Sequence, residues 1–367
     1  MQKLLILSSN TGEGHNSAAA AIGFAARTAG LKAVIRKPLE ESGPVNRALG
    51  SLYNTLLARR PRAIRQYFWL LDRIRPNERT FFYTKVRPYI RRFLDSEQPD
   101  IVLSVHPMLN HFIQRFIKEE QVGIPCHTFL TDPFPPFWKG WSSPYIDRYF
   151  VVTGEAAQTL TTMGISSSRI DRVPMPVRSQ FAPATMTEIQ ELRNTLKLDD
   201  AGIILINGGA RGGGPILKVY ETTRRAAQAA NILVVCGRNS RLRQRIEALR
   251  DPKTRTFGFL DDIYRYISAS DLVITKPGAL STYEALACGV PVVLIGIRDL
   301  MPQESGLFDA AARSDFGYAA GTFAALDAVV RKDPREWNRK RESLANFYRH
   351  SVGSELVERI HSVHVRS

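Results

Sequence analysis

The sequence LVITKPGALSTYEALACGVPVVLI, residues 272–295, contains the pattern that decides the fold class. Two short apolar runs, Leu272–Ile274 and Val292–Ile295, flank a longer helix-forming stretch, and glycine and proline mark both connections. A strand, a helix and a second strand in this order are typical of a βαβ unit with parallel strands. The same alternation predicts an α/β protein with further strands at Leu4–Ser8, Ile101–Val105, His127–Leu130, Tyr149–Val152, Ile203–Ile206 and Leu233–Cys236.

Chain length and proline distribution indicate two domains. A chain of 367 residues exceeds the usual size of one domain. Prolines in Val173–Val177 and Ala182–Ala184 favour an extended connection over a helix. We therefore expect one domain at residues 1–177 and another at residues 185–340. By analogy with other two-lobed α/β proteins, a C-terminal helix at about residues 345–367 is expected to pack back on the first domain.

Composition limits the class of protein. Hydrophobic residues make up 44% and charged residues 23%, which excludes disorder and fibrous repeats. A net charge of +15 predicts a polyanionic partner or an anionic surface. Three cysteines are too few for a disulfide framework, so we expect a reduced, cytosolic compartment. Without a signal peptide or the roughly 18–20 apolar residues that span a bilayer, the protein is expected to be peripheral on the cytoplasmic side of a membrane.

Three glycine-containing turns connect predicted strands to predicted helices. The first, Thr11–His15, brings backbone N–H groups to a helix N-terminus, where an anion can bind, although a tight turn without a ligand is the alternative. A nicotinamide dinucleotide is disfavoured because the third glycine is missing and the second strand ends in Arg36-Lys37. The second turn, Gly208–Gly214, has five glycines before Pro215 and favours a diphosphate ligand over a packing role.

The third turn combines backbone donors with a carboxylate. Gly278–Ser281 can present N–H groups, and Glu284 follows one helical turn later. A carboxylate there can accept hydrogen bonds from the vicinal hydroxyls of a ribose, but Ser281 and Glu284 also fit a capping box. Together with the absence of an Asp-x-Asp motif, these turns favour a nucleotide-sugar enzyme that uses no metal ion.

The segment Thr275–Pro291 resembles the nucleotide-sugar signature of one group of GT-B glycosyltransferases. The group includes monogalactosyldiacylglycerol synthases, processive diacylglycerol glucosyltransferases and the N-acetylglucosaminyltransferase that forms lipid II. The resemblance covers most of the chain and implies two Rossmann-like lobes with parallel sheets that face a central cleft. Further similar segments are Thr11–His15, Pro99–Pro107, Thr131–Pro133, Val235–Asn239, Phe257–Phe259 and Ile267–Asp271, and those with His106 and Lys276–Gly278 resemble the diacylglycerol branch.

The resemblance implies a UDP-sugar as donor substrate and no cofactor. Glu284 would bind the ribose, the backbone of Gly278–Ser281 the diphosphate, and Phe259 and Leu260 the uracil. Pro302 stands where the family usually has glycine, which leaves galactose versus glucose open. The expected nucleotide-sugar site consists of Gly208, Gly209, Arg238, Phe259, Leu260, Gly278, Ala279, Leu280, Ser281, Glu284, Gln303 and Glu304.

The family inverts the anomeric carbon, which implies direct attack by the acceptor hydroxyl. His15 is the expected catalytic base, because an imidazole titrates near neutrality, and binding of the acceptor or of an anionic lipid is its alternative role. Asp132 is the alternative base or the group that orients an imidazole. His106 and His111 lack a matched third ligand, so we expect roles in the cleft wall or in packing rather than a metal site.

Two aromatic segments predict contact with lipid. Residues 59–92 contain eleven Lys and Arg against two Asp and Glu, with aromatic residues between them, which favours an anionic membrane over a solvated helix face or nucleic acid. Prolines within residues 134–141 predict a loop with exposed rings at an acyl-chain entrance, loop packing being the alternative. The residues expected at the acceptor or the membrane are Gly14, Arg62, Arg65, Trp69, His106, Phe134, Phe137, Trp138 and Trp141.

These features predict a peripheral, metal-independent, inverting enzyme that transfers a hexose from a UDP-sugar to diacylglycerol or a glycosylated diacylglycerol. Another lipid acceptor, such as a polyprenyl-linked sugar, is the first alternative. A noncatalytic basic protein that binds lipid or nucleic acid is the second, and Glu284 and the glycine turns disfavour it. The hexose, the number of sugars transferred and the oligomeric state stay open.

Overall fold

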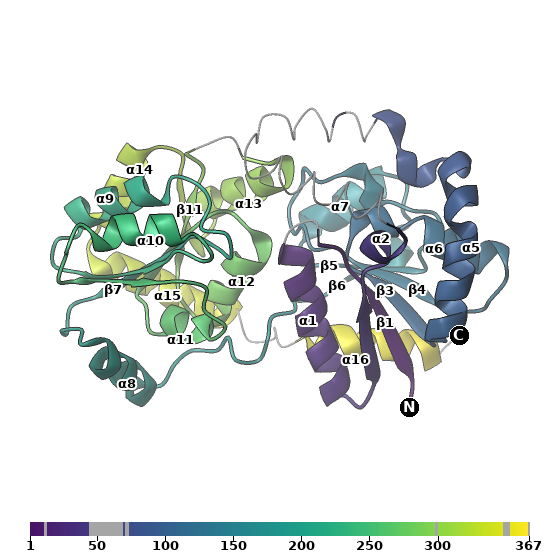
Figure 1. Cartoon of the computed structure of the whole chain (residues 1–367), viewed down its shortest axis with the longest axis horizontal. Helices are drawn as coiled ribbons and strands as arrows, with labels where there is room; N and C mark the ends of the chain where they lie inside the picture. Colours follow the sequence, from purple (N-terminus) through teal and green to yellow (C-terminus); the bar gives the residue numbers. More distant parts are fainter. Residues whose placement is uncertain (11–12, 44–68, 70–72, 298–299, 348–352, 366–367) are drawn as a thin grey trace. The chain divides into compact units, whose positions relative to one another are not determined.

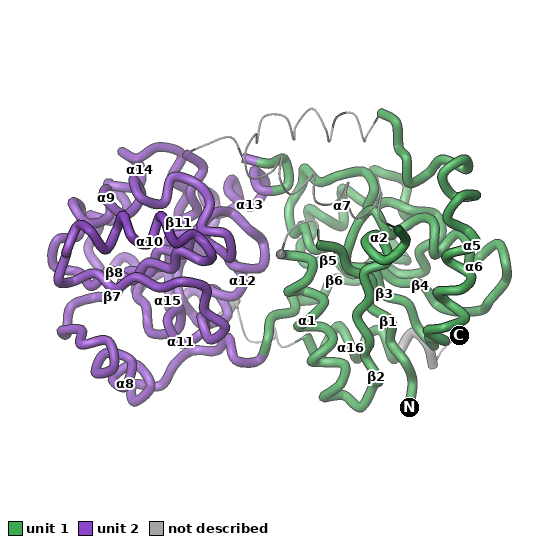
Figure 2. Tube along the Cα trace, viewed as in Figure 1, with its two compact units in different colours: residues 1–178, 301–303, 350–367 green, residues 179–300, 304–349 purple. Residues whose placement is uncertain are grey.

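The computed structural model describes residues 1–10, 13–43, 69, 73–297, 300–347 and 353–365, and the chain divides into two compact units (Figures 1 and 2). Unit 1 comprises residues 1–178, 301–303 and 350–367, and unit 2 comprises residues 179–300 and 304–349. Each unit contains one six-stranded sheet whose neighbouring strands are all parallel. The predicted α/β class is confirmed.

Unit 1 begins with a buried strand, β1, whose side chains alternate between two helical layers. Ile6 approaches α1, while Leu5 and Leu7 join the apolar cluster formed with α5 and α6. The C-terminal helix α16 packs on α1, and the two lie side by side in Figure 1. The elements are β1 (Lys3–Leu7), α1 (Glu13–Thr28), β2 (Lys32–Arg36), α2 (Pro38–Glu41), η1 (Pro76–Glu78), α5 (Thr80–Glu97), β3 (Ile101–Ser104), η2 (Pro107–Leu109), α6 (Phe112–Glu119), β4 (Cys126–Phe129), η3 (Lys139–Trp141), β5 (Arg148–Val151), α7 (Gly154–Thr162), η4 (Ser167–Arg169), β6 (Ile170–Arg172) and α16 (Ser354–Val365).

Unit 2 repeats the parallel arrangement around a second core. Apolar side chains of β7, β8 and β10 pack with residues of α9, α10 and α14. The elements are α8 (Met186–Leu196), β7 (Ile203–Asn207), α9 (Ile216–Ala226), β8 (Asn231–Val235), α10 (Ser240–Glu247), β9 (Thr254–Phe257), α11 (Ile263–Ser268), β10 (Leu272–Thr275), α12 (Ala279–Ala287), β11 (Val292–Ile295), α13 (Pro302–Arg313), β12 (Gly317–Ala320), α14 (Phe323–Val330) and α15 (Pro334–Phe347).

The strand order gives each sheet one switch point. In unit 1 the order is β2-β1-β3-β4-β5-β6, so the chain leaves β1 toward one edge and later adds β3 on its other side. In unit 2 the order is β12-β11-β10-β7-β8-β9, and the corresponding pair is β7 and β10. In open parallel sheets, ligands bind beyond the carboxyl ends of the strands at such a point. The fold therefore marks one candidate position in each unit.

Every strand that the sequence analysis named lies within one or two residues of an observed strand. The strands that it did not name are β6, β9 and β12. All three are edge strands that include partly exposed residues. None of them contains a long apolar run, and the sequence of β12 is GYAA. Among the described helices, none is long and apolar enough to cross a membrane.

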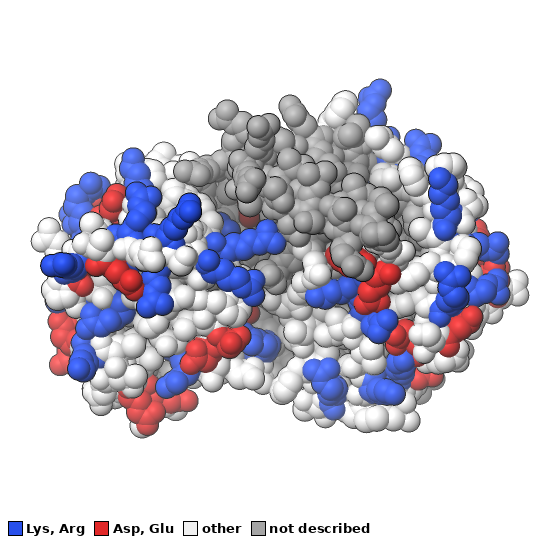
Figure 3. All heavy atoms as spheres, viewed as in Figure 1, with Lys and Arg blue, Asp and Glu red and all other residues white. Residues whose placement is uncertain are grey.

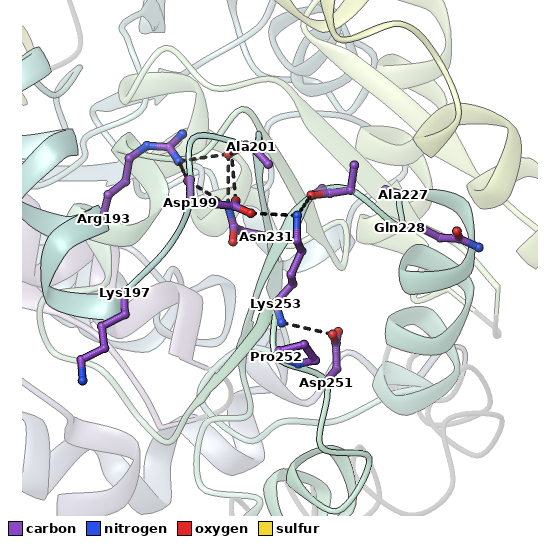
Figure 4. Close-up of polar contacts among 12 residues, drawn as sticks. Arg193, Lys197, Asp199, Ala201, Ala227, Gln228, Asn231, Asp251, Pro252 and Lys253 are labelled. Atoms are coloured by element: carbon purple, nitrogen blue, oxygen red, sulfur yellow. Dashed lines mark hydrogen bonds and ion pairs between the residues drawn. The ribbon is translucent and has the colours of Figure 1, made fainter.

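A polar network joins α8 to the amino ends of three strands in unit 2 (Figure 4). Asp199 Oδ2 lies 2.8 Å from Lys253 Nζ, and Asp199 Oδ1 accepts a hydrogen bond from Asn231 Nδ2 at 2.8 Å. Arg193 Nη1 donates to the Ala201 carbonyl at 3.0 Å. Hydrogen bonds from Lys253 and Asn231 lower the pKa of Asp199 to about 2. This network lies at the amino ends of the strands, whereas the switch point lies at their carboxyl ends.

Candidate functional site

The candidate base, His15, lies in the first turn of α1, at the switch point of unit 1. Its Nδ1 is 2.8 Å from the carbonyl oxygen of Val105, which follows β3, and 3.0 Å from Thr131 Oγ1, which follows β4. A carbonyl oxygen only accepts hydrogen bonds, so Nδ1 carries the proton of the neutral ring. The lone pair of the imidazole is then on Nε2.

The surroundings of His15 favour its neutral form. Burial lowers the pKa of His15, and this effect outweighs the attraction of the Asp132 carboxylate, which raises it. The ring of His106 lies at 4.5 Å from that of His15, and burial together with His15 holds the pKa of His106 well below its usual value. An uncharged imidazole with an Nε2 lone pair can accept a proton at neutral pH.

Asp132 follows β4 and acts on His15 through its charge. Its Oδ2 accepts a hydrogen bond of 2.8 Å from the indole Nε1–H of Trp141. Burial raises the pKa of Asp132, while His15 and the Trp141 hydrogen bond oppose that rise. Val105 and Thr131 lie within hydrogen-bond distance of His15 Nδ1. They therefore orient the imidazole, a role that the sequence analysis suggested for Asp132.

The aromatic loop after Asp132 is more buried than expected. Trp141 is fully buried and Phe137 is 7% exposed, and both belong to an apolar cluster with residues of β5 and α7. The prediction that these two rings stand exposed is therefore wrong, because the loop folds inward onto the sheet. Phe134 and Trp138 are partly buried, and their place at an acyl-chain entrance stays a prediction.

The other residues predicted at the acceptor side have different surroundings. Gly14 is exposed at the start of α1, and the Trp69 side chain is 62% exposed. His106 is buried, and its Nδ1 accepts a hydrogen bond from the Met108 N–H, which fits the expected packing role. His111 is also buried. Thr11, Gly12, Arg62 and Arg65 lie outside the described residues.

In unit 2 the switch point is formed mainly by backbone. The Gly208–Gly214 turn after β7 packs against the turn after β8. A Cβ atom on Gly212 would lie 2.0 Å from the Cys236 carbonyl oxygen, and one on Gly237 would lie 2.3 Å from that of Gly209. The two turns approach so closely that packing alone explains the glycines at positions 212 and 237. A diphosphate role for Gly208 and Gly209 stays a prediction.

Helix α12 follows β10, the second of the two strands that form this switch point. Gly278 is its N-cap residue, so Ser281 lies inside the first turn, and its hydroxyl donates to the Gly278 carbonyl at 3.1 Å. The capping-box alternative is therefore wrong, because it requires Ser281 at the N-cap position. The first N–H groups of a helix have no partner within it, and they favour an anion. Glu284 lies in the middle of α12 and is partly buried.

Nearby groups of unit 2 supply an aromatic and a cationic surface. The Phe259 side chain is 48% exposed, and the Arg238 guanidinium lies 4.9 Å from the centre of its ring. Leu260 is partly buried beside it in sequence. In the first turn of α13, Gln303 ends the 301–303 segment of unit 1 and Glu304 begins the last segment of unit 2, and both are partly buried. No group of three or more possible metal-binding side chains occurs within the described ranges.

The sequence analysis missed three partners around the turn after β1. Val105 and Thr131 hold His15, and Glu40 accepts hydrogen bonds from the Ser9 hydroxyl and the Asn10 N–H at 2.8 and 2.7 Å. The strand order β2-β1-β3-β4 explains all three, because each partner follows a strand near β1. That order was the signal that could have identified them.

Two family models match the chain, one in each half. Residues 15–177 match monogalactosyldiacylglycerol (MGDG) synthase, and residues 203–303 match the glycosyltransferase family 28 C-terminal domain. A protein of Bacillus cereus (strain AH187) named processive diacylglycerol beta-glucosyltransferase is 26% identical over 98% of this chain and 93% of its own length. Its namesake in Bacillus licheniformis is 28% identical over 84% and 80% of the two chains.

Solved structures share the whole fold. Acinetobacter baumannii MurG is similar with a TM-score of 0.65 and 14% identity over 99% of this chain and 100% of that one. Anabaena Alr3699/HepE in complex with UDP-glucose has a TM-score of 0.62 and 12% identity over 99% and 100%. These likenesses confirm the predicted two-lobed fold, and the family models confirm the predicted resemblance.

Proposed function

We propose that this chain, which carries the MGDG synthase domain and the glycosyltransferase family 28 C-terminal domain, transfers a hexose from a UDP-sugar to diacylglycerol or a glycosylated diacylglycerol. The names of the MGDG synthase model and of the Bacillus relatives support glycosyl transfer to this lipid, and the name of the second model supports glycosyl transfer. The observation that carries the catalytic part is the neutral His15, with its Nδ1 held by the Val105 carbonyl.

The donor would bind at the switch point of unit 2. The diphosphate accepts hydrogen bonds from the N–H groups at the start of α12, and the Glu284 carboxylate accepts those of the ribose hydroxyls. The uracil lies along Phe259 and Leu260, and Gln303 and Glu304 bind the hexose. The complex of Alr3699/HepE with UDP-glucose supports a UDP-sugar as donor. The relatives' name favours glucose, while the family model's name favours galactose.

His15 would act as the base of a single displacement. Its Nε2 takes the proton of the acceptor hydroxyl while the oxygen bonds to C1 of the hexose. The bond from C1 to the diphosphate oxygen breaks on the opposite face, and its electron pair leaves with UDP. Attack opposite the leaving group inverts C1. The backbone N–H groups of α12 stabilise the charge on the diphosphate, so the reaction needs no metal ion.

Exposed rings and cations on α5 and the segment before it support contact with an anionic membrane. Trp69 and Phe81 are each 62% exposed. The Arg73 guanidinium lies 5.7 Å from the Trp69 ring centre, and Lys85 Nζ lies 4.2 Å from that of Phe81. On the face in Figure 3, other Lys and Arg side chains are spread over both units. Apolar rings flanked by cations suit an interface of acyl chains and anionic headgroups.

A product assay tests this function. The protein is incubated with labelled UDP-glucose, UDP-galactose or UDP-N-acetylglucosamine and with vesicles that contain diacylglycerol or a polyprenyl-linked sugar, each with and without EDTA. We expect labelled glycosyl-diacylglycerol of inverted configuration, an EDTA-resistant rate, and faster turnover on anionic than on neutral vesicles.

Three results, two from this assay and one from calorimetry, would contradict the proposal. If label appeared only in the polyprenyl-linked product, the acceptor would be that lipid and not diacylglycerol. If EDTA abolished the activity and manganese restored it, the reaction would depend on a metal ion. Calorimetry that detects no UDP binding would favour a noncatalytic basic protein.

A further inference from the structure

The Trp141 side chain has a single polar atom, the indole Nε1, and its N–H donates a hydrogen bond to Asp132. The ring is fully buried in the apolar cluster with Tyr149 and residues of α7, where an indole packs well but its N–H needs an acceptor. The acceptor is Asp132 Oδ2, at 2.8 Å. The ring centre is also 6.3 Å from that of His15. Trp141 thus lies beside both His15 and Asp132.

The backbone of Trp141 is anchored independently of the indole. The Trp141 N–H donates to the Trp138 carbonyl at 3.2 Å within η3. The Trp141 carbonyl accepts a hydrogen bond of 3.2 Å from Asn110 Nδ2, and Asn110 in turn accepts one from Thr128 Oγ1 of β4. Asn110 is fully buried. These contacts link η3 to the same strand that Asp132 follows, so the indole N–H and the carboxylate have a fixed separation.

We propose that Trp141 is a positioning residue of the transfer reaction, which holds the Asp132 carboxylate charged and aimed beside His15 through the indole N–H. This inference rests on the proposed function. A hydrogen bond to a carboxylate favours its charged form. That negative charge favours the imidazolium that forms when His15 Nε2 accepts the acceptor's proton. Trp141 therefore acts on the base through Asp132 without touching the substrate.

The sign of the effect follows from the charges around His15. Asp132, after β4, raises the pKa of His15, while burial lowers it; His106, after β3, is the other titratable ring in contact. Loss of the indole N–H raises the pKa of Asp132 and weakens its charge, so the pKa of His15 falls further. Because the neutral imidazole is the active form, the acid limb of kcat then moves to lower pH. The weaker base also lowers kcat on the plateau.

The test combines Trp141→Phe with a matched control, Tyr149→Phe. Tyr149 is buried in the same cluster and its hydroxyl donates to the Ser143 carbonyl at 2.6 Å, so its removal also costs a buried aromatic hydrogen bond. We expect Trp141→Phe to lower plateau kcat about 3-fold or more, with an unchanged KM for the UDP-sugar, and to shift the acid limb downward. Tyr149→Phe changes stability but moves neither the acid limb nor plateau kcat.

The pathway through Asp132 is tested with a double variant and with NMR. In the Asp132→Asn background, Trp141→Phe has no further effect on kcat or on the acid limb, because the two residues act as one unit. The Cε1–H resonance of His15, assigned by its loss in His15→Asn, reports the pKa of the ring without any substrate. It shifts to lower pH in Trp141→Phe and in Asp132→Asn.

Two results would overturn the positioning role. One is a titration of His15 that moves no more in Trp141→Phe than in Tyr149→Phe, and the other is a full additional loss in the double variant. The NMR readout separates this inference from the proposed function. If the protein transfers no hexose to any acceptor but the His15 titration shifts as stated, the proposed reaction fails and the contact among the three residues stands.

Discussion

The switch points of the two sheets are formed by different kinds of chemical group. In unit 1, partly buried titratable side chains lie there: the His15 imidazole contacts Val105 and Thr131, and Asp132 accepts a hydrogen bond from the Trp141 indole. In unit 2, the corresponding position consists of close-packed glycine turns and the start of α12. The same parallel topology therefore supports a titratable site in one unit and a backbone site in the other.

This difference teaches how each unit would contribute to the proposed transfer. Burial shifts the pKa values of His15 and Asp132, and a shifted pKa adapts a side chain to moving a proton. Backbone N–H groups cannot titrate, but they bind an anion at fixed positions without a counter-ion. We therefore expect variants in unit 1 to change kcat and its pH dependence, and variants in unit 2 to change donor affinity or the fold.

The largest expected effect is that of His15→Ala. Removal of the base lowers kcat about 10²–10⁴-fold, whereas the affinity for UDP, measured by calorimetry, stays within about 2-fold. Retained full activity would eliminate the base role and favour binding of the acceptor. A loss of UDP affinity as large as the loss of kcat would break the division of labour between the units.

The next effect is that of Glu284→Ala on donor affinity. Loss of charge-assisted hydrogen bonds to the ribose raises the Kd for UDP about 10- to 100-fold. The matched control is the ligand: 2′,3′-dideoxy-UDP lacks both hydroxyls, so its Kd is the same for the variant and the parent protein. An equal loss for both ligands would assign Glu284 to the fold rather than to the ribose. The His15 titration is expected to stay unchanged.

Two glycines of unit 2 separate packing from backbone strain. Gly237 and Gly209 both have positive φ angles, of 55° and 69°, but a Cβ atom would clash with backbone only at Gly237. Alanine at either position costs about 1 kcal/mol of strain, and Gly237→Ala costs about 2 kcal/mol more because the two turns must separate. Urea denaturation of both variants measures the difference. Equal losses would show that the close approach is not what requires glycine at Gly237.

Much of the fold and part of the site follow from local sequence. Apolar runs with glycine turns identified the buried strands, and the short strand with the Thr11–His15 turn identified His15. The edge strands β6, β9 and β12 gave no such signal, since none of them contains an apolar run like those of the central strands. Local pattern also suggested a capping box at Ser281, and only the observed helix start, at Gly278, rejects it.

The role of Trp141 shows why other residues could not be predicted. Aromatic rings next to prolines are typical of an exposed loop, and residues 134–141 gave no sign of an inner surface. Their burial depends on packing with β5 and α7, which follow the loop in the chain but contact it only after the sheet has formed. The partner of the indole, Asp132, was recognised as a candidate, but the bond between them is a tertiary contact.

The smallest expected effect lies at the amino ends of the unit 2 strands, whereas the switch point of that sheet lies at their carboxyl ends. The pKa of Asp199 in the folded state, about 2, is below its unfolded value, so its contribution to stability is present above about pH 4 and is lost as pH falls toward 2. Asp199→Asn therefore reduces the free energy of unfolding slightly at pH 7 and flattens its decline in acid, as urea denaturation between pH 2 and 7 measures. Asp200→Asn, at the exposed neighbouring carboxylate, is the control. If Asp199→Asn altered kcat or the Kd for UDP, the amino ends of the strands would be coupled to their carboxyl ends, and the assignment of function to the switch points alone would be wrong.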